Sequence, residues 1–177
     1  MVCKTTGKLL VYLVVFLGLA SKLLVEGVFV FKSLASPGYS WGFNDDGITT
    51  LKKGFGIRCF RVLPGLTGHQ TTVSFESKDH PDYFLCNVNS VLKLVKRPHV
   101  DRHHRFARHA SFKPTVGFWH AGYTVYEAMT RSNFYIRQSN FTLRVEKYDD
   151  TEKFRQEASF RTELESNCGF TSLYNFT

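Results

Sequence analysis

The stretch Phe134–Phe160, FYIRQSNFTLRVEKYDDTEKFRQEASF, decides the fold of this chain because the sequence uses it more than once. An earlier copy, Tyr83–Phe112, reads YFLCNVNSVLKLVKRPHVDRHHRFARHASF. The front halves align without a gap, and after a difference in loop length the ends align again, Ala110-Ser111-Phe112 on Ala158-Ser159-Phe160. Agreement on both sides of a polar insertion indicates a real internal repeat, and a repeat dictates architecture.

A third, more divergent copy comes first in the chain. Phe31-Lys32-Ser33 matches Phe75-Glu76-Ser77, and Pro37-Gly38-Tyr39 matches Pro81-Asp82-Tyr83. We therefore divide the domain, residues 28–165, into three units and a C-terminal tail. Their predicted bounds are 28–68, 69–119 and 120–165 for the units and 166–177 for the tail.

Each unit divides into four short segments of β type. Within 142–146, for example, every second residue is apolar, as a half-buried strand requires. The strands expected in the second and third units are 72–77, 83–87, 91–95, 110–113, 124–128, 134–138, 142–146 and 158–162. Only 150–156 has the pattern of a helical turn.

Three units of four short strands predict an all-β fold, and specifically a β-trefoil. In that fold six strands form a barrel and three hairpins close it, because one unit cannot bury its apolar face alone. Equivalent residues of the units should then share one core. These are Phe60, Phe112 and Phe160, and Leu51, Leu92 and Leu143.

The N-terminal segment predicts a signal peptide over 1–20. Lys4 and Lys8 precede an apolar run, 9–19, and a small-residue cleavage site follows it. The alternative is a hydrophobic helix kept as a membrane anchor, but Lys22 interrupts the apolar run before it reaches the roughly 20 residues that a span needs. We expect cleavage, a secreted protein, and no membrane contact afterwards.

Three cysteines would remain after cleavage: Cys59, Cys86 and Cys168. In an oxidising compartment an odd number predicts one bridge and one leftover thiol, with the pairing open. The sequon Asn140-Phe141-Thr142 makes Asn140 a candidate for N-glycosylation.

A formal net charge of +8 indicates either anionic partners or simple solubility. Nucleic acid is not expected as the partner of an exported chain. The charge concentrates in 96–109, at Lys96, Arg97, Arg102, Arg105 and Arg108. This basic patch predicts binding of sulfated or sialylated glycans, a metal site at His103, His104 and His109, or only a solvated loop.

The same residues resemble a known family, the arabinose-binding domain of B-type α-L-arabinofuranosidases (carbohydrate-binding module family 42). The similarity rests on Phe75-Glu76-Ser77, Tyr135-Ile136-Arg137, Asn140-Phe141 and the two Ala-Ser-Phe endings, and extends over most of residues 30–164. The resemblance implies a β-trefoil that binds sugar without catalysing a reaction, since the family's hydrolase activity belongs to a separate domain.

The resemblance also implies where sugar would bind. The family's units use a His that follows an Arg and an Asp that precedes Ala-Ser/Thr-Phe. Here those two positions hold Asn87 and His109 in the second unit, and Gln138 and Glu157 in the third. The first unit offers only Ile57 at the Asp position. Amide, imidazole and carboxylate groups still bind hydroxyls, and Tyr83, Phe134 or Tyr135 would support the ring of the sugar.

The sequence therefore predicts a secreted, lectin-like carbohydrate-binding domain with altered contact residues. The alternative is an extracellular protein-interaction module that keeps the scaffold and has lost sugar binding. An enzyme is not expected, because no pair of carboxylates is placed to face one cleft.

Overall fold

A computed structural model describes residues 27–165, and these form twelve strands in one sheet with very little helix. The prediction of an all-β chain is therefore confirmed. The predicted signal peptide and the tail lie outside the described residues. The strands are β1 (Val28–Ser33), β2 (Ser40–Phe43), β3 (Thr49–Lys52), β4 (Phe60–Pro64), β5 (Val73–Ser77), β6 (Tyr83–Val88), β7 (Val91–Lys96), β8 (Phe112–Val116), β9 (Thr124–Ala128), β10 (Phe134–Ser139), β11 (Thr142–Lys147) and β12 (Phe160–Leu164).

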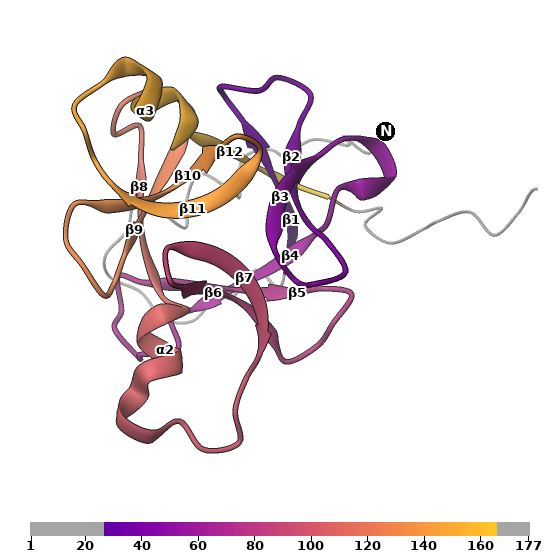
Figure 1. Cartoon of the computed structure of the whole chain (residues 1–177), viewed down its shortest axis with the longest axis vertical. Coiled ribbons are helices and arrows are strands. Elements are labelled where there is room, and N and C mark those ends of the chain that lie inside the picture. Colours follow the sequence, from indigo (N-terminus) through magenta and orange to yellow (C-terminus); the bar gives the residue numbers. More distant parts are fainter. Residues whose placement is uncertain (1–26, 166–177) are drawn as a thin grey trace, which may run out of the picture.

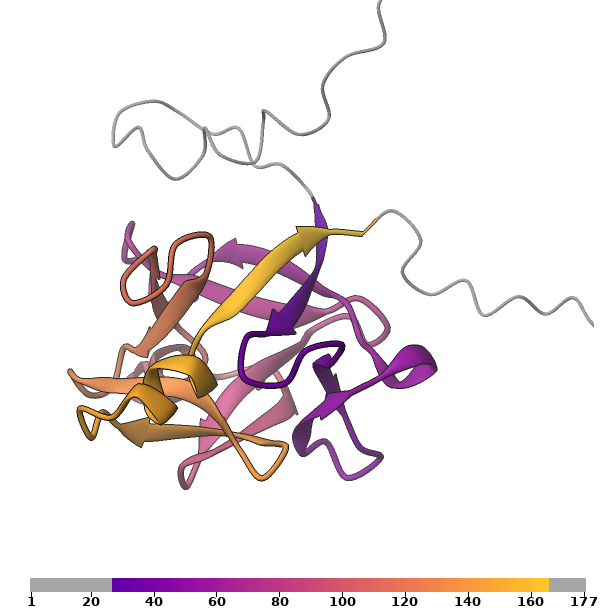
Figure 2. The same ribbon diagram turned by 90° about the horizontal axis from the view of Figure 1, so that it is seen from above.

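Six of the strands pair in a closed ring. Strand β1 pairs with β4, β4 with β5, β5 with β8, β8 with β9, β9 with β12, and β12 with β1 again, all antiparallel. The first and last strands thus lie side by side, which Figure 2 shows as the adjacent indigo and yellow arrows. A closed ring leaves no edge among these six strands that could pair with another chain.

The other six strands form three hairpins, β2–β3, β6–β7 and β10–β11. The hairpins touch one another through single ladder contacts, Thr142 with Thr50, Arg144 with Val91, and Ile48 with Lys93. Consecutive thirds of the chain accordingly occupy three sectors around the centre of the view in Figure 1.

The turns of two hairpins show why the repeat keeps Asn there. Asn89 and Ser90 have φ of 51° and 66°, and Asn140 and Phe141 have φ of 49° and 62°. Positive φ at both central residues defines a type I′ turn, whose twist matches the right-handed twist of the two flanking strands. Asn tolerates the left-handed conformation better than most residues. The two turns are therefore equivalent in backbone, although Phe141 is far larger than Ser90.

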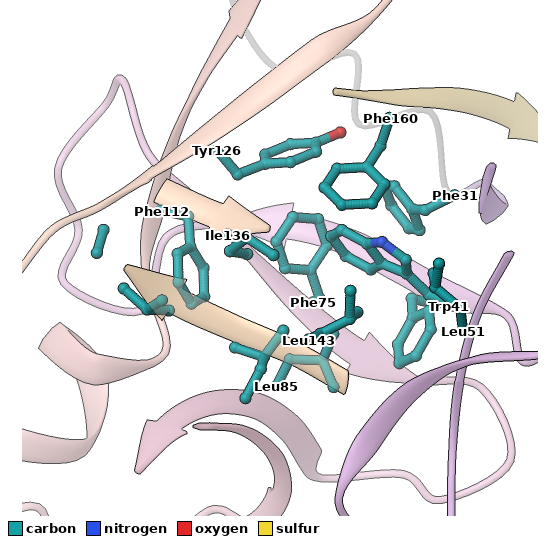
Figure 3. Packing of buried hydrophobic residues seen from close by; sticks show 14 residues of the cluster. Phe31, Trp41, Leu51, Phe75, Leu85, Phe112, Tyr126, Ile136, Leu143 and Phe160 are labelled. Atoms are coloured by element: carbon teal, nitrogen blue, oxygen red, sulfur yellow. The ribbon is translucent and has the colours of Figure 1, made fainter. Parts of the chain in front are cut away.

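One apolar cluster fills the interior of the ring, and it contains all six residues predicted to share the core. Trp41 is completely buried and stacks on Phe31, with ring centroids 4.3 Å apart. Aromatic rings from every part of the chain pack edge to face around them, as Figure 3 shows. Edge-to-face aromatic pairs stabilise the folded state by more than the burial of their surface alone. These rings therefore hold the three thirds of the described chain together.

Two short helices separate the third and fourth strands of the later units. Helix α3 (Glu152–Glu157) falls on the predicted turn, and the Thr151 side chain caps it by accepting from the Phe154 N–H at 3.1 Å. Helix α2 (Arg105–His109) comes directly after the 3-10 turn η2 (Arg102–His104). Another 3-10 turn, η1 (Gly54–Gly56), lies between β3 and β4. Residues 105–109 were predicted as part of a loop, so α2 is a difference from the prediction.

The fourth strands begin two residues later than predicted, at Phe112 and Phe160. The reason is that Ala110 and Ala158 are the C-terminal caps of α2 and α3, and each cap N–H bonds back into its helix.

Cys59 is disulfide-bonded, whereas Cys86 has a free, buried thiol. This agrees with the expected bridge and leftover thiol. No helix within residues 27–165 is long and apolar enough to cross a membrane.

Candidate functional site

The predicted pair in the third unit, Gln138 and Glu157, does come together. Gln138 Nε2 donates to Glu157 Oε1 at 3.4 Å, across the contact between β10 and the end of α3. Both residues are buried, and Arg137 donates a second bond to the Glu157 carboxylate. The Gln138 carbonyl oxygen accepts from the Phe141 N–H at 3.1 Å. The polar groups of this pair are therefore already engaged with the protein.

Arg137 organises the third site. Its guanidinium lies 4.6 Å from the centre of the Phe154 ring, and Nη1 lies 3.4 Å from Glu146 Oε2. Only 13% of the Arg137 side chain is exposed. A charged group this deeply buried needs a partner of opposite charge, because an unpaired buried charge lowers the stability of the folded state.

Aromatic rings also fill the region around this pair. Phe141 packs against Tyr39 with ring centroids 5.0 Å apart. Tyr135, a predicted support for sugar, is buried against Phe154 and Trp119. Sugar binding by the third unit stays a prediction, but the structure offers its pair no free polar atom.

The predicted pair in the second unit has a different setting. Asn87 and His109 line a cavity of about 430 Å³ between the β6–β7 hairpin, α2 and the start of β10. This volume lies within the usual range for small-ligand pockets. Its walls are formed by Asn87, Asn89, Ser90, Arg105, Arg108, His109, Thr130, Arg131, Phe134 and Val145. A backbone bond of 3.0 Å from Val145 N to Ser90 O ties the two units together at the cavity.

Both members of this pair carry a buried polar atom with no hydrogen-bond partner among the described residues. The atoms are Asn87 Oδ1 and His109 Nδ1. Leaving such an atom unsatisfied costs about 1–3 kcal/mol, and most buried polar groups in native structures bond to protein, water or a ligand. The second pair is therefore unsatisfied, in contrast with the third.

The two sites differ through matched replacements. Cys86 occupies the position of Arg137, and His109 that of Glu157, so the cation and the acid are both absent from the second unit. Cys86 instead packs in an apolar cluster with Phe84 and Ala110. At the turn, Ser90 stands where the third unit has Phe141, and the small side chain leaves the cavity open.

Two of the predicted aromatic supports, Phe134 and Tyr83, each line a cavity of the preceding unit. Phe134, which begins the first hairpin strand of the third unit, lines the cavity of the second. Tyr83, its equivalent, lines a separate cavity of about 1070 Å³ in the first unit, together with Ile57. Cys59, which is disulfide-bonded, is on the wall of that larger cavity.

The basic patch is divided by the structure. Arg105 and Arg108, three residues apart on α2, line the second-unit cavity. The other three members, Lys96, Arg97 and Arg102, are exposed and do not line it. Within residues 27–165 no group of three or more His, Cys, Asp or Glu is arranged to hold a metal ion.

Arg131 is a charged residue of the cavity that was not predicted from the sequence. It lies in the loop before β10, and its guanidinium is 5.1 Å from the centre of the Phe134 ring. Its counterpart in the preceding unit is His80, so the repeat itself carried no signal for an arginine here. Asn140, the predicted glycosylation site, is exposed at the β10–β11 turn.

Comparison with known proteins identifies a domain family and a shared fold. The profile of the alpha-L-arabinofuranosidase B (ABFB) domain matches residues 53–162. Otogelin-like protein of Mus musculus is 34% identical over 110 residues, and that of Homo sapiens is 32% identical over 109. The match covers 59% of this chain but only 5% and 4% of those proteins, so the chain spans a small part of their length.

Two solved structures of arabinofuranosidases share the fold. A mutant GH54 α-L-arabinofuranosidase superposes with a TM-score of 0.67 at 17% identity, over 81% of this chain and 32% of that one. An arabinofuranosidase complexed with arabinofuranosyl-alpha-1,2-xylobiose gives 0.66 at 18% identity, over 82% and 32%. Because the profile covers more than half of the residues, this chain belongs to the alpha-L-arabinofuranosidase B (ABFB) domain family.

Proposed function

We propose that this chain is a secreted, non-catalytic carbohydrate-binding domain with a β-trefoil architecture, and that its principal sugar site is the second-unit cavity. The observation that carries the proposal is the pair Asn87 and His109. Both line a cavity of ligand size while each keeps a buried polar atom without a partner among the described residues.

The chemistry of the cavity suits a sugar. An amide and an imidazole donate and accept hydrogen bonds, so together they match the paired hydroxyls of a sugar ring. The Phe134 ring supplies an apolar surface at the same cavity. Pockets that combine an apolar wall with a few convergent polar groups are the usual form of small-ligand sites.

The trefoil assignment is supported by the pairing pattern. A closed ring of six strands with three mutually touching hairpins is the arrangement that three repeated units would produce. The units 28–68, 69–119 and 120–165 each contribute one hairpin and two ring strands.

Secretion is supported by the disulfide at Cys59, since such bonds persist in oxidising compartments. The predicted signal peptide agrees with it. The non-catalytic role is supported by the family match, which concerns the ABFB domain. Such a domain would act by binding a sugar, without catalysing a reaction.

A glycan array tests the sugar site. We expect the wild-type chain to bind a restricted set of glycans, and Asn87→Ala and His109→Ala to lose that signal. Gln70→Ala and His99→Ala are matched controls, because both residues are exposed and lie outside the cavity. All four variants should unfold cooperatively near the wild-type temperature. An array on which Asn87→Ala and wild type behave alike would remove the cavity from the proposal.

The second candidate is an extracellular protein-interaction module. It is favoured by Phe55, which is 92% exposed on the 3-10 turn η1. Aromatic side chains such as Phe are enriched at protein interfaces relative to the rest of the surface. Phe55 does not line the second-unit cavity, so Phe55→Ser should leave glycan signals unchanged and weaken only a protein contact.

A further inference from the structure

We infer that the second-unit cavity selects sugars that carry an anionic group, a carboxylate or a sulfate ester. This inference rests on the proposed function, because it names the substrate class of the same site. Neutral sugars lack the negatively charged group that the arginines of the cavity would bind.

Charge is the first argument. Three of the ten residues that line the cavity are arginines, Arg105, Arg108 and Arg131, and none is Asp or Glu. The arginines converge from two sides, two from α2 and one from the loop before β10. A concave surface of one sign concentrates ligands of the opposite sign.

The second argument is that the protein leaves these charges uncompensated. No ion pair is formed by Arg105, Arg108 or Arg131 with any acid of residues 27–165. The acid just before α2, Asp101, is occupied elsewhere. Its Oδ1 and Oδ2 each accept a backbone N–H at 2.9 Å, from Phe106 and Ala107, and so cap α2.

Comparison with the third unit is the third argument. There the equivalent position is Glu157, and its carboxylate pairs with Arg137 inside the protein. In the second unit His109 replaces the carboxylate that would repel an anion. The replacement therefore removes negative charge from a site whose wall also carries three arginines.

Guanidinium groups suit this ligand class. Their planar donors bind the two oxygens of a carboxylate or sulfate together, and such charge-assisted bonds are stronger than neutral ones. Arg131 already lies over Phe134, so its planar group is held at the cavity wall. The anion and the sugar ring would thus be recognised at adjacent places, by the arginines and by Phe134 with Asn87.

The competing view is that the arginines belong to a solvated basic surface. That view predicts equal roles for the members of the basic patch outside the cavity, Lys96, Arg97 and Arg102. The cavity view predicts that only the lining arginines matter. Arg97 is therefore the matched control, because it is exposed, of the same type, and outside the cavity.

The test is an array of neutral, sialylated, uronate-containing and sulfated glycans. It is followed by titration of N-acetyllactosamine and of its sialylated and sulfated forms, together with any anionic glycan that the array selects. We expect anionic glycans to bind at least tenfold more tightly than their neutral counterparts. Arg108→Gln and Arg131→Gln should each lose about tenfold to a hundredfold in affinity, the value of one charge-assisted hydrogen bond. Arg97→Gln should bind as wild type does.

The outcomes separate the two proposals. Neutral glycans that bind as well as anionic ones, with loss in Asn87→Ala but not in Arg108→Gln, would overturn the anionic preference and keep the sugar site. Equal losses in Arg97→Gln and Arg108→Gln would also overturn it, because they indicate attraction by the whole surface. An array with no glycan signal would remove both proposals.

Discussion

Removing the Arg137 side chain should destabilise the fold more than any other single change at the two sites. Arg137→Met keeps much of the apolar stem over Phe154 but leaves the Glu157 carboxylate, 7% exposed, without its cation. Breaking a buried ion pair on one side costs about 3–5 kcal/mol. Glu157 keeps its bond to Gln138, so the lower end, about 3 kcal/mol, is the expected loss.

Neutralising the acid of this pair instead of the cation should reduce the free energy of unfolding by less. Glu157→Gln preserves the shape and leaves Arg137 with Glu146, 3.4 Å away. A loss of about 1–2 kcal/mol is expected, the value of a charged hydrogen bond that is partly replaced. The double variant contains no unpaired buried charge from the pair, so its loss should be smaller than the sum of the single losses by about 1–3 kcal/mol.

Urea unfolding of the four proteins measures this coupling. Arg161→Met is the control, because Arg161 is exposed and only stacks on Tyr123, at 4.8 Å; its loss should stay below about 1 kcal/mol. Against a typical domain stability of about 5–15 kcal/mol, the Arg137→Met loss is large enough to shift the midpoint clearly. A loss below about 1 kcal/mol for Arg137→Met, or strict additivity in the double variant, would refute the ion-pair account.

Three further predictions concern single groups. Burial, with the charge of Asp101 adding to it, raises the pKa of the Cys86 thiol to about 12; iodoacetamide at pH 8 should leave the native thiol intact and modify it after unfolding, as mass spectrometry would show. Burial acts to raise the pKa of Asp101, but the backbone N–H groups of Ala107 and Phe106 outweigh that and hold the pKa below the usual range of an aspartate. The resulting stability is present above the ordinary pKa of an aspartate and is lost as pH falls through the lowered value, so Asp101→Asn should flatten the acid side of the stability profile. Thr151→Ala removes the cap on the Phe154 N–H and should cost about 1 kcal/mol in urea unfolding.

The sequence predicted most of the strands because the repeat aligns residues with the same burial. Phe60, Phe112 and Phe160 are all completely buried in one cluster, as equivalent positions of a shared core should be. Helix α2 escaped prediction because its sequence, RFARH, is too short to show helical periodicity. The two residues before it, His103 and His104, have the left-handed conformation, and neither is a residue type that usually caps a helix.

The candidate site was predicted only in part. The resemblance to the arabinose-binding family identified Asn87 and His109, because they occupy the positions of that family's sugar-binding His and Asp, and both line the cavity. Phe134 was predicted as a support for the ring of a sugar but was not linked to this cavity, and Arg131 was not predicted. Both reach the cavity from the next unit along the chain. Contacts across the boundary between units depend on how the hairpins pack, and an alignment of the units with one another contains no such information.

This boundary position also explains how the sites were able to diverge separately. The equivalent aromatic residues Tyr39, Tyr83 and Phe134 each lie at the site of the preceding unit in the closed ring. At the third site Phe141 packs on Tyr39; at the second, Ser90 leaves Phe134 accessible to the cavity. The backbone of the two turns is the same, so at this position the two sites differ only in the side chain. Changes of this kind spare the shared core, and a three-unit scaffold can therefore use one site for stability while another acquires a different ligand.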